Sequence, residues 1–180
     1  GDGMLEGIDV SPTASESQYS KILEYIGIGT EEGAKLAYGG RGLDGPEFQG
    51  GYYIEPTIFV DVQEDMRIAQ EEIFGPVLTV FKANDLDDAI RLANSVKFGL
   101  SSSIYTQDLN KGFQYVNQVE AGMVHINSPT LGGEVHLPFG GTKASGVGAR
   151  EQGTEAVNFF SEVVTVYVDY AASQTQAKFI

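Results

Sequence analysis

The stretch from Pro76 to Asn127 alternates two kinds of segment, and this alternation constrains the fold more than any other feature. Three strand-like apolar runs, "PVLTVFKA", "GLSSSIYT" and "AGMVHIN", are separated by two amphipathic runs, "DLDDAIRLANSV" and "DLNKGFQYVNQV". An aspartate, Asp85 or Asp108, opens each amphipathic run, as expected of a helix N-cap. Strands that alternate with helices favour parallel crossovers, so we predict an α/β fold with a mostly parallel sheet and flanking helices.

The first half of the chain predicts one longer helix followed by two strands. Residues 15–28, "SESQYSKILEYIGI", carry an apolar stripe at helical spacing, and Ser15 or Ser17 is suited to cap it. "AKLAYGG" predicts a short buried strand, and "YYIEPTIFVDV" predicts an edge strand because Pro56 interrupts it. Between these strands, the glycine-rich residues 39–51 predict a surface loop. Near the C-terminus we expect a helix over residues 153–160 and a last strand, "EVVTVYVDY".

Charge and composition exclude several classes of protein. Asp and Glu number 25 against 11 Lys and Arg, a net charge of −14, which argues against nucleic acid and against an anionic membrane surface as partners. No apolar run approaches the length of a membrane span, and the start "GDGMLEGIDV" lacks the features of a signal peptide. The chain contains no cysteine, which removes disulfides and thiolate ligands. These features lead us to expect a cytoplasmic protein.

Most motif-like patterns in the chain favour structural explanations. Gly40–Gly45 matches G-x-G-x-x-G, but the following "PEFQGGYYIEP" does not predict the helix that a pyrophosphate site needs. Asp85 and the aspartates after it suit a helix start better than a metal site. His125 and His136 lack a partner at metal-binding spacing, so we predict no metal site. No G-x-S-x-G elbow supports a hydrolase.

Two glycine-containing segments are more specific. "EEIFGP" sets two carboxylates and an aromatic residue before a Gly-Pro turn, and Pro76 directs the chain into a strand. "LPFGGTKASGVGARE" places Phe139 against two glycines, which is typical of a loop that presents a bulky ring. Each segment alone is compatible with either a binding edge or an ordinary turn. Their order and the α/β pattern between them indicate one family.

The sequence resembles the aldehyde dehydrogenase superfamily, in the later part of its catalytic domain. The matching segments run in order from "GDGML" through "SESQYSKILEYIGIGTEEGAKLAYGG", "EEIFGPVLTV", "ANSVKFGLSSSIYTQDL", "AGMVHIN" and "LPFGGTKASGVG" to "VTVYV". The resemblance implies a partial catalytic domain over residues 1–160, an oligomerisation strand over 161–170 and a tail over 171–180. It also implies a homo-oligomer formed through residues 161–170.

The resemblance further implies site residues and a cofactor, NAD or NADP. Glu72 would accept hydrogen bonds from the nicotinamide ribose hydroxyls, because a carboxylate can accept both protons of a diol, and Phe74 would pack beside that ribose. Phe139 would form a wall of the aldehyde entrance. The loop from Asn127 to His136 would shape substrate choice, with Asn127 bracing the catalytic loop.

The departures from the family pattern concern the reaction itself. The family's cysteine attacks the aldehyde to give a thiohemiacetal, passes hydride to NAD(P), and leaves a thioester for hydrolysis. This chain holds no cysteine, so we expect Gly1 to be a cut within a longer enzyme, no catalytic residue in the segment, and no activity of the segment alone. "INSPTLGGEVHLPFGG" resembles the branch that oxidises 2-oxoglutarate semialdehyde. Such an acidic substrate needs a cationic anchor, a role that the sequence does not assign to Lys143 or Arg150.

Three functions stay open on the sequence. The chain could be the C-terminal catalytic segment of an NAD(P)-dependent aldehyde dehydrogenase that acts on a small aldehyde. It could instead be a truncated, non-catalytic paralogue that acts as an interaction module through its last strand and acidic surface. A third possibility is a free-standing nucleotide-binding domain that uses Glu72 and Phe74.

Overall fold

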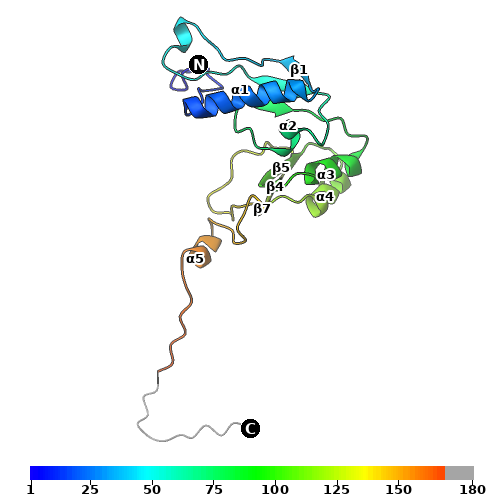
Figure 1. Ribbon diagram of the computed structural model, residues 1–180. Coiled ribbons are helices and arrows are strands. Elements are labelled where there is room, and N and C mark those ends of the chain that lie inside the picture. The colour runs from blue at the N-terminus through cyan, green and yellow to red at the C-terminus, as the bar shows by residue number, and fades with distance from the viewer. Residues whose placement is uncertain (169–180) are drawn as a thin grey trace, which may run out of the picture.

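The computed structural model describes residues 1–168 and confirms the α/β class (Figure 1). The helices are α1 (Glu16–Glu31), η1 (Pro46–Phe48, a 3-10 helix), α2 (Arg67–Gln70), α3 (Leu86–Asn94), α4 (Leu109–Gln118) and α5 (Glu155–Phe159). The strands are β1 (Lys35–Tyr38), β2 (Thr57–Val60), β3 (Val77–Thr79), β4 (Phe98–Gly99), β5 (Ser101–Ile104), β6 (Met123–Ile126) and β7 (Thr142–Lys143).

The strands form three small sheets, and parallel pairing is limited to part of them. In the first sheet, ordered β1-β2-β3, β2 pairs antiparallel with β1 and parallel with β3. The pair β5-β6 is parallel and is connected by α4, as the alternation of segments predicts. The pair β4-β7 is antiparallel. Figure 1 shows the first sheet with α1 in the upper part and the other two sheets with α3 and α4 below it.

The predictions for β1 and β2 were wrong in their placement. All four residues of β1 are exposed, because this strand lies at the edge of its sheet. The strand predicted at the edge, β2, is instead the central one. Pro56 does not disturb it, since the strand begins one residue later at Thr57, whose N–H donates to the Pro76 carbonyl at 2.8 Å.

The main core lies between α1 and the first sheet. Of the two serines predicted as candidate caps, Ser15 caps α1 and accepts from the Gln18 N–H at 3.2 Å. Ile22 from α1 and Phe59 from β2 are fully buried. The other buried members of this cluster come from α1, α2 and the loops around them: Tyr25, Ile26, Ala34, Ile54, Val62, Met66, Ile68 and Ile73.

The lower part is organised by two capped helices. Asp85 and Asp108 cap α3 and α4 as predicted, each accepting a backbone N–H from the first turn. Asn94 joins the two helices at their ends, because its amide donates to the Gln118 carbonyl and accepts from the Glu120 N–H, both at 2.8 Å. The ends of α3 and α4 are therefore tied together by one side chain.

The segment after α5 runs away from the body of the molecule (Figure 1). Residues 161–168 are exposed and form no strand within the described chain, and the last two residues of the predicted strand 161–170 lie outside it. Val164, Val166 and Tyr167 are each more than 70% exposed. None of the helices within residues 1–168 is long and apolar enough to cross a membrane.

Candidate functional site

The loop Glu71–Pro76 leaves α2 and enters β3, with its backbone anchored to α1. Gln18 donates from Nε2 to the carbonyls of Ile73 and Phe74, at 2.9 and 2.8 Å. Lys21 donates from Nζ to the Glu72 carbonyl at 3.2 Å. Three consecutive carbonyls of the loop thus bond to one helix, and this accounts for a defined loop conformation without a regular secondary structure.

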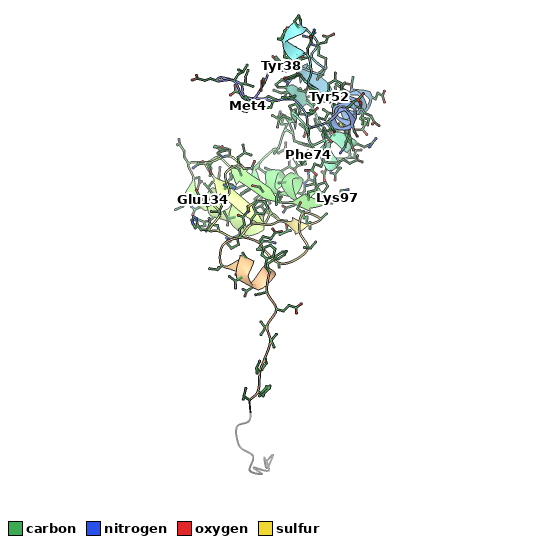
Figure 2. The ribbon with its side chains drawn as sticks, turned by 90° about the vertical axis from the view of Figure 1, so that its left-hand side faces the viewer. Met4, Tyr38, Tyr52, Phe74, Lys97 and Glu134 are labelled. Carbon is green, nitrogen blue, oxygen red and sulfur yellow. The ribbon has the colours of Figure 1, made fainter. Side chains whose placement is uncertain are left out.

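Glu72 and Phe74 are presented on the outside of this loop. No hydrogen bond or ion pair among the described residues uses the Glu72 carboxylate, and the residue is exposed. The Phe74 side chain is 74% exposed, and its φ of 57° lies in the left-handed region. Figure 2 shows Phe74 at the level where the upper and lower groups of elements meet. A free carboxylate beside an exposed ring fits a ribose diol with an apolar face.

Gly75 and Pro76 direct the chain into β3, as the sequence predicts. A Cβ on Gly75 would lie 2.5 Å from Ile22 Cδ1, so only glycine allows the loop to approach α1 this closely. The Pro76 carbonyl then accepts from the Thr57 N–H and starts the parallel pairing of β3 with β2.

The first carboxylate of the motif has a different environment from the second. Glu71 accepts from Tyr25 Oη at 2.5 Å and from Arg67 Nη2 at 2.9 Å and Nε at 3.1 Å. These bonds, that of Arg67 first and then that of Tyr25, lower the pKa of Glu71 to about 2. The hydrogen bond to Glu71 is also the main cause that raises the pKa of Tyr25.

Phe139 lines a cavity of about 440 Å³ beside β6. Its backbone pairs with Glu151 in both directions, with N–O distances of 2.6 and 2.8 Å, so the ring is held from a short two-stranded bridge. The lining side chains include Met123, His125, Glu134, Leu137, Phe139 and Gln152. The cavity is thus a partly apolar space with one imidazole and one carboxylate.

The structure does not place the predicted substrate and cofactor residues in one cavity. The lining of the cavity beside Phe139 includes none of Glu72, Phe74 and Asn127. Asn127 lies beyond the end of β6, where its Oδ1 accepts from the Thr106 N–H at 2.8 Å and its Nδ2 donates to the Thr106 carbonyl at 2.9 Å. The Asn127 amide therefore braces the turn between β5 and α4.

The two cations considered as substrate anchors are used elsewhere. Lys143 Nζ donates to the carbonyls of Asn94 and Val96 and pairs with Glu120. Arg150 Nη1 donates to the Gly141 carbonyl at 2.6 Å. Neither lines the cavity beside Phe139. Among residues 1–168, no three His, Cys, Asp or Glu side chains are grouped to hold a metal ion.

The sequence reasoning missed the residues that hold the loop, above all Gln18, Tyr25 and Arg67. Gln18, Lys21, Ile22 and Tyr25 are spaced by three, one and three residues, which is one face of a helix. This spacing indicated that the four side chains lie on one face of the helix. Because the face mixes polar and aromatic residues, it does not form the apolar stripe from which a buried helix face is predicted.

Comparison with known proteins decides the family. A model of the aldehyde dehydrogenase family matches residues 1–166. The chain belongs to this family. The α-ketoglutaric semialdehyde dehydrogenase of Bacillus subtilis is 44% identical over 168 residues, which cover 93% of this chain and 34% of the relative. The 2,5-dioxopentanoate dehydrogenase of Saccharolobus solfataricus is 47% identical over 163 residues, 90% of this chain and 33% of the relative.

Solved structures agree with this assignment. The NAD+ complex of an aldehyde dehydrogenase from Bacillus cereus superposes with a TM-score of 0.86 at 38% identity, covering 95% of this chain and 34% of that one. This aldehyde dehydrogenase chain therefore spans about a third of the length of its relatives. The predicted superfamily and fold class are confirmed.

Proposed function

We propose that this chain supplies the nicotinamide-ribose edge and one wall of the aldehyde entrance in an NAD(P)-dependent aldehyde dehydrogenase. The observation that carries the proposal is the geometry of "EEIFGP": a free Glu72 carboxylate and an exposed Phe74 ring stand on a loop whose carbonyls are anchored to α1. An ionised carboxylate accepts from both ribose hydroxyls, and the ring shields one side of the sugar.

The residues of this chain orient the reactants in this proposal and do not react with them. When bound, NAD(P) would supply the hydride acceptor of the reaction. Glu72 would fix the ribose, and hence the direction of the nicotinamide, while Phe139 would exclude water from one side of the aldehyde. The chain contains no cysteine, so the nucleophile lies outside it, and we expect the 180 residues alone to be inactive.

The proposed substrate is 2-oxoglutarate semialdehyde. Two relatives at 44% and 47% identity are named for this compound, which is also called 2,5-dioxopentanoate. Of the cavity-lining residues, only His125 offers a cationic form. An anchor for the single carboxylate of the substrate would therefore come mainly from regions that the relatives have and this chain does not span.

The proposal also includes a cytoplasmic homo-oligomer joined through residues 161–170. The exposed, mostly β-branched run Val163–Val168 supports the oligomer, because an exposed segment of this composition can pair as a strand with another sheet.

A chimera tests the proposed function. Residues 1–168 replace the matching third of the Bacillus subtilis relative. Oxidation of 2-oxoglutarate semialdehyde is then compared, with NAD+ and with NADP+, to oxidation of betaine aldehyde, the compound for which another relative at 44% identity is named. We expect activity, with preference for the semialdehyde. Glu72→Ala should raise the KM for the cofactor about tenfold or more, the usual cost of losing hydrogen bonds to a charged group.

Asp44→Ala, at another exposed acidic residue, is the matched control and should leave the cofactor KM unchanged. A folded but inactive chimera would contradict the proposal as a whole. An unchanged cofactor KM in Glu72→Ala would contradict the role of Glu72, and aldehyde oxidation by the 180-residue chain alone would contradict the missing nucleophile.

A further inference from the structure

The two adjacent carboxylates of "EEIFGP" are used in different ways. Glu71 is bonded on the protein side, by Tyr25 and Arg67, whereas the Glu72 carboxylate has no partner among the described residues. Tyr25 is 9% exposed, so its hydroxyl is a fixed donor rather than a mobile surface group. Glu71 is therefore a fixed point directly before the residues that the proposed function assigns to the cofactor.

One face of α1 contacts the whole loop in sequence order. Tyr25 reaches Glu71, Lys21 reaches the Glu72 carbonyl, and Gln18 reaches the carbonyls of Ile73 and Phe74. The helix runs antiparallel to the loop in these contacts, because lower helix numbers meet higher loop numbers. Since an α-helix is stiff over this distance, it sets the spacing of the loop residues.

The backbone of Phe74 needs such support. A φ of 57° is unfavourable for an aromatic residue by about 1–3 kcal/mol, and the exposed ring gains little burial in return. Its conformation is held from outside, by the Gln18 bond to its carbonyl and by the anchored residues before it. A strained backbone that keeps a ring exposed points to a role in binding.

The Glu71 anchor is itself braced by α2. Arg67 Cζ lies 5.3 Å from the centre of the Tyr25 ring, and its Nη2 and Nε donate to the Glu71 carboxylate. The Arg67 N–H donates to Glu32 Oε2 at 2.8 Å, which ties the start of α2 to the end of α1. The planar guanidinium thus keeps both the ring and the carboxylate in place.

From these contacts we infer that Tyr25, Glu71 and Arg67 form a positioning cluster, which fixes the backbone conformation of residues 72–74. In this conformation the loop presents the Glu72 carboxylate and the Phe74 ring to a ribose. The part of this inference that concerns the ribose rests on the proposed function. The part that concerns the backbone does not, and the two parts can be tested separately.

Chymotrypsin cleavage after Phe74 measures the backbone part in the 180-residue chain. The ring is already exposed, but the protease must take the Phe74 carbonyl into its oxyanion hole, and that carbonyl is bonded to Gln18. Cleavage after Phe74 therefore reports release of the loop from α1. Cleavage after Tyr105, which is 68% exposed in the lower part, serves as an internal reference. Fragment masses identify each site.

Tyr25→Phe and Glu71→Gln should each accelerate cleavage after Phe74 about three- to tenfold, the effect of losing ordinary hydrogen bonds. Cleavage after Tyr105 should change little in either variant. Glu55→Gln is the matched control, because it breaks the Arg41–Glu55 pair on the same part of the molecule without touching the loop.

NAD+ at millimolar concentration adds a readout that a purely structural cluster would not change. In the unsubstituted chain, NAD+ should slow cleavage after Phe74, and this protection should be lost in Tyr25→Phe and Glu71→Gln. The positioning role would be overturned if Tyr25→Phe and Glu71→Gln accelerated cleavage after Phe74 no more than Glu55→Gln does. It would also be overturned if these variants accelerated cleavage after Tyr105 as much as cleavage after Phe74. Selective acceleration without any NAD+ protection of the unsubstituted chain would support the backbone role and refute the ribose edge.

Discussion

Two glycines in α1 provide a test of the core that isolates a single contact. Gly27 and Gly29 both lie inside the helix, and neither has a positive φ. A Cβ on Gly27 would meet nothing within 4 Å, whereas a Cβ on Gly29 would lie 2.9 Å from Ile68 Cδ1 and 3.2 Å from Phe59 Cζ. Ile68 is 3% exposed and Phe59 is fully buried, so neither can swing out to solvent.

The expected magnitudes follow from these distances. Alanine gains about 0.4–1 kcal/mol over glycine at either position, through helix propensity and a less flexible unfolded chain. At Gly29 this gain is offset by about 1–3 kcal/mol of overpacking. Because the propensity gain is common to both positions, the difference in unfolding free energy between Gly27→Ala and Gly29→Ala measures the overpacking alone.

Urea unfolding followed by far-UV circular dichroism suits this comparison, since the chain has no tryptophan. With a slope of about 2 kcal/mol per molar urea, the two midpoints should differ by about 0.5–1.5 M, with Gly27→Ala the higher. Adding Ile68→Val to Gly29→Ala should recover part of the loss, because it deletes the nearest atom. Equal midpoints for the two alanine variants would refute the packing described here.

Three further predictions concern a buried hydroxyl, a shifted carboxylate and the exposed terminal run. Thr57→Val should lower the unfolding free energy by about 1–3 kcal/mol in urea titrations, because the buried hydroxyl accepts from the Gly40 N–H and donates to the Glu55 carbonyl. An unchanged urea midpoint would contradict these two hydrogen bonds. The pKa of Glu71 falls from 4.5 to about 2 on folding, so the stabilisation by its ion pair is present above about pH 5 and lost as the pH falls toward 2. The unsubstituted chain should therefore unfold at a higher urea concentration than Glu71→Gln at pH 5, and this difference should shrink toward pH 2. A difference that stays constant with pH would argue against the ion pair. Val166→Pro should reduce self-association in light scattering if residues 161–170 pair with a partner, and equal masses would count against that pairing.

Local features of the fold were predictable from the sequence. The helix over α1 and the caps Ser15, Asp85 and Asp108 follow from apolar spacing and from side chains that bond to free N–H groups of the first turn, and both depend only on neighbours in the chain. The turn at Gly75–Pro76 and the resemblance to aldehyde dehydrogenases were also readable, because they reside in short motifs.

The order of the strands in the first sheet and the contacts that hold the Glu71–Pro76 loop could be learned only from the tertiary structure. Whether β1 or β2 is central depends on which strands pair, and that pairing joins residues far apart in the chain. Likewise, no local pattern reveals that Glu71 bonds to Tyr25, 46 positions earlier, and leaves Glu72 free. The sequence alone therefore determined the local elements and the family motifs, since these depend on nearby residues. The resemblance indicated Glu72 as the carboxylate that faces the cofactor, but only the folded chain shows that Glu71 serves the scaffold, because its partners Tyr25 and Arg67 lie on α1 and α2.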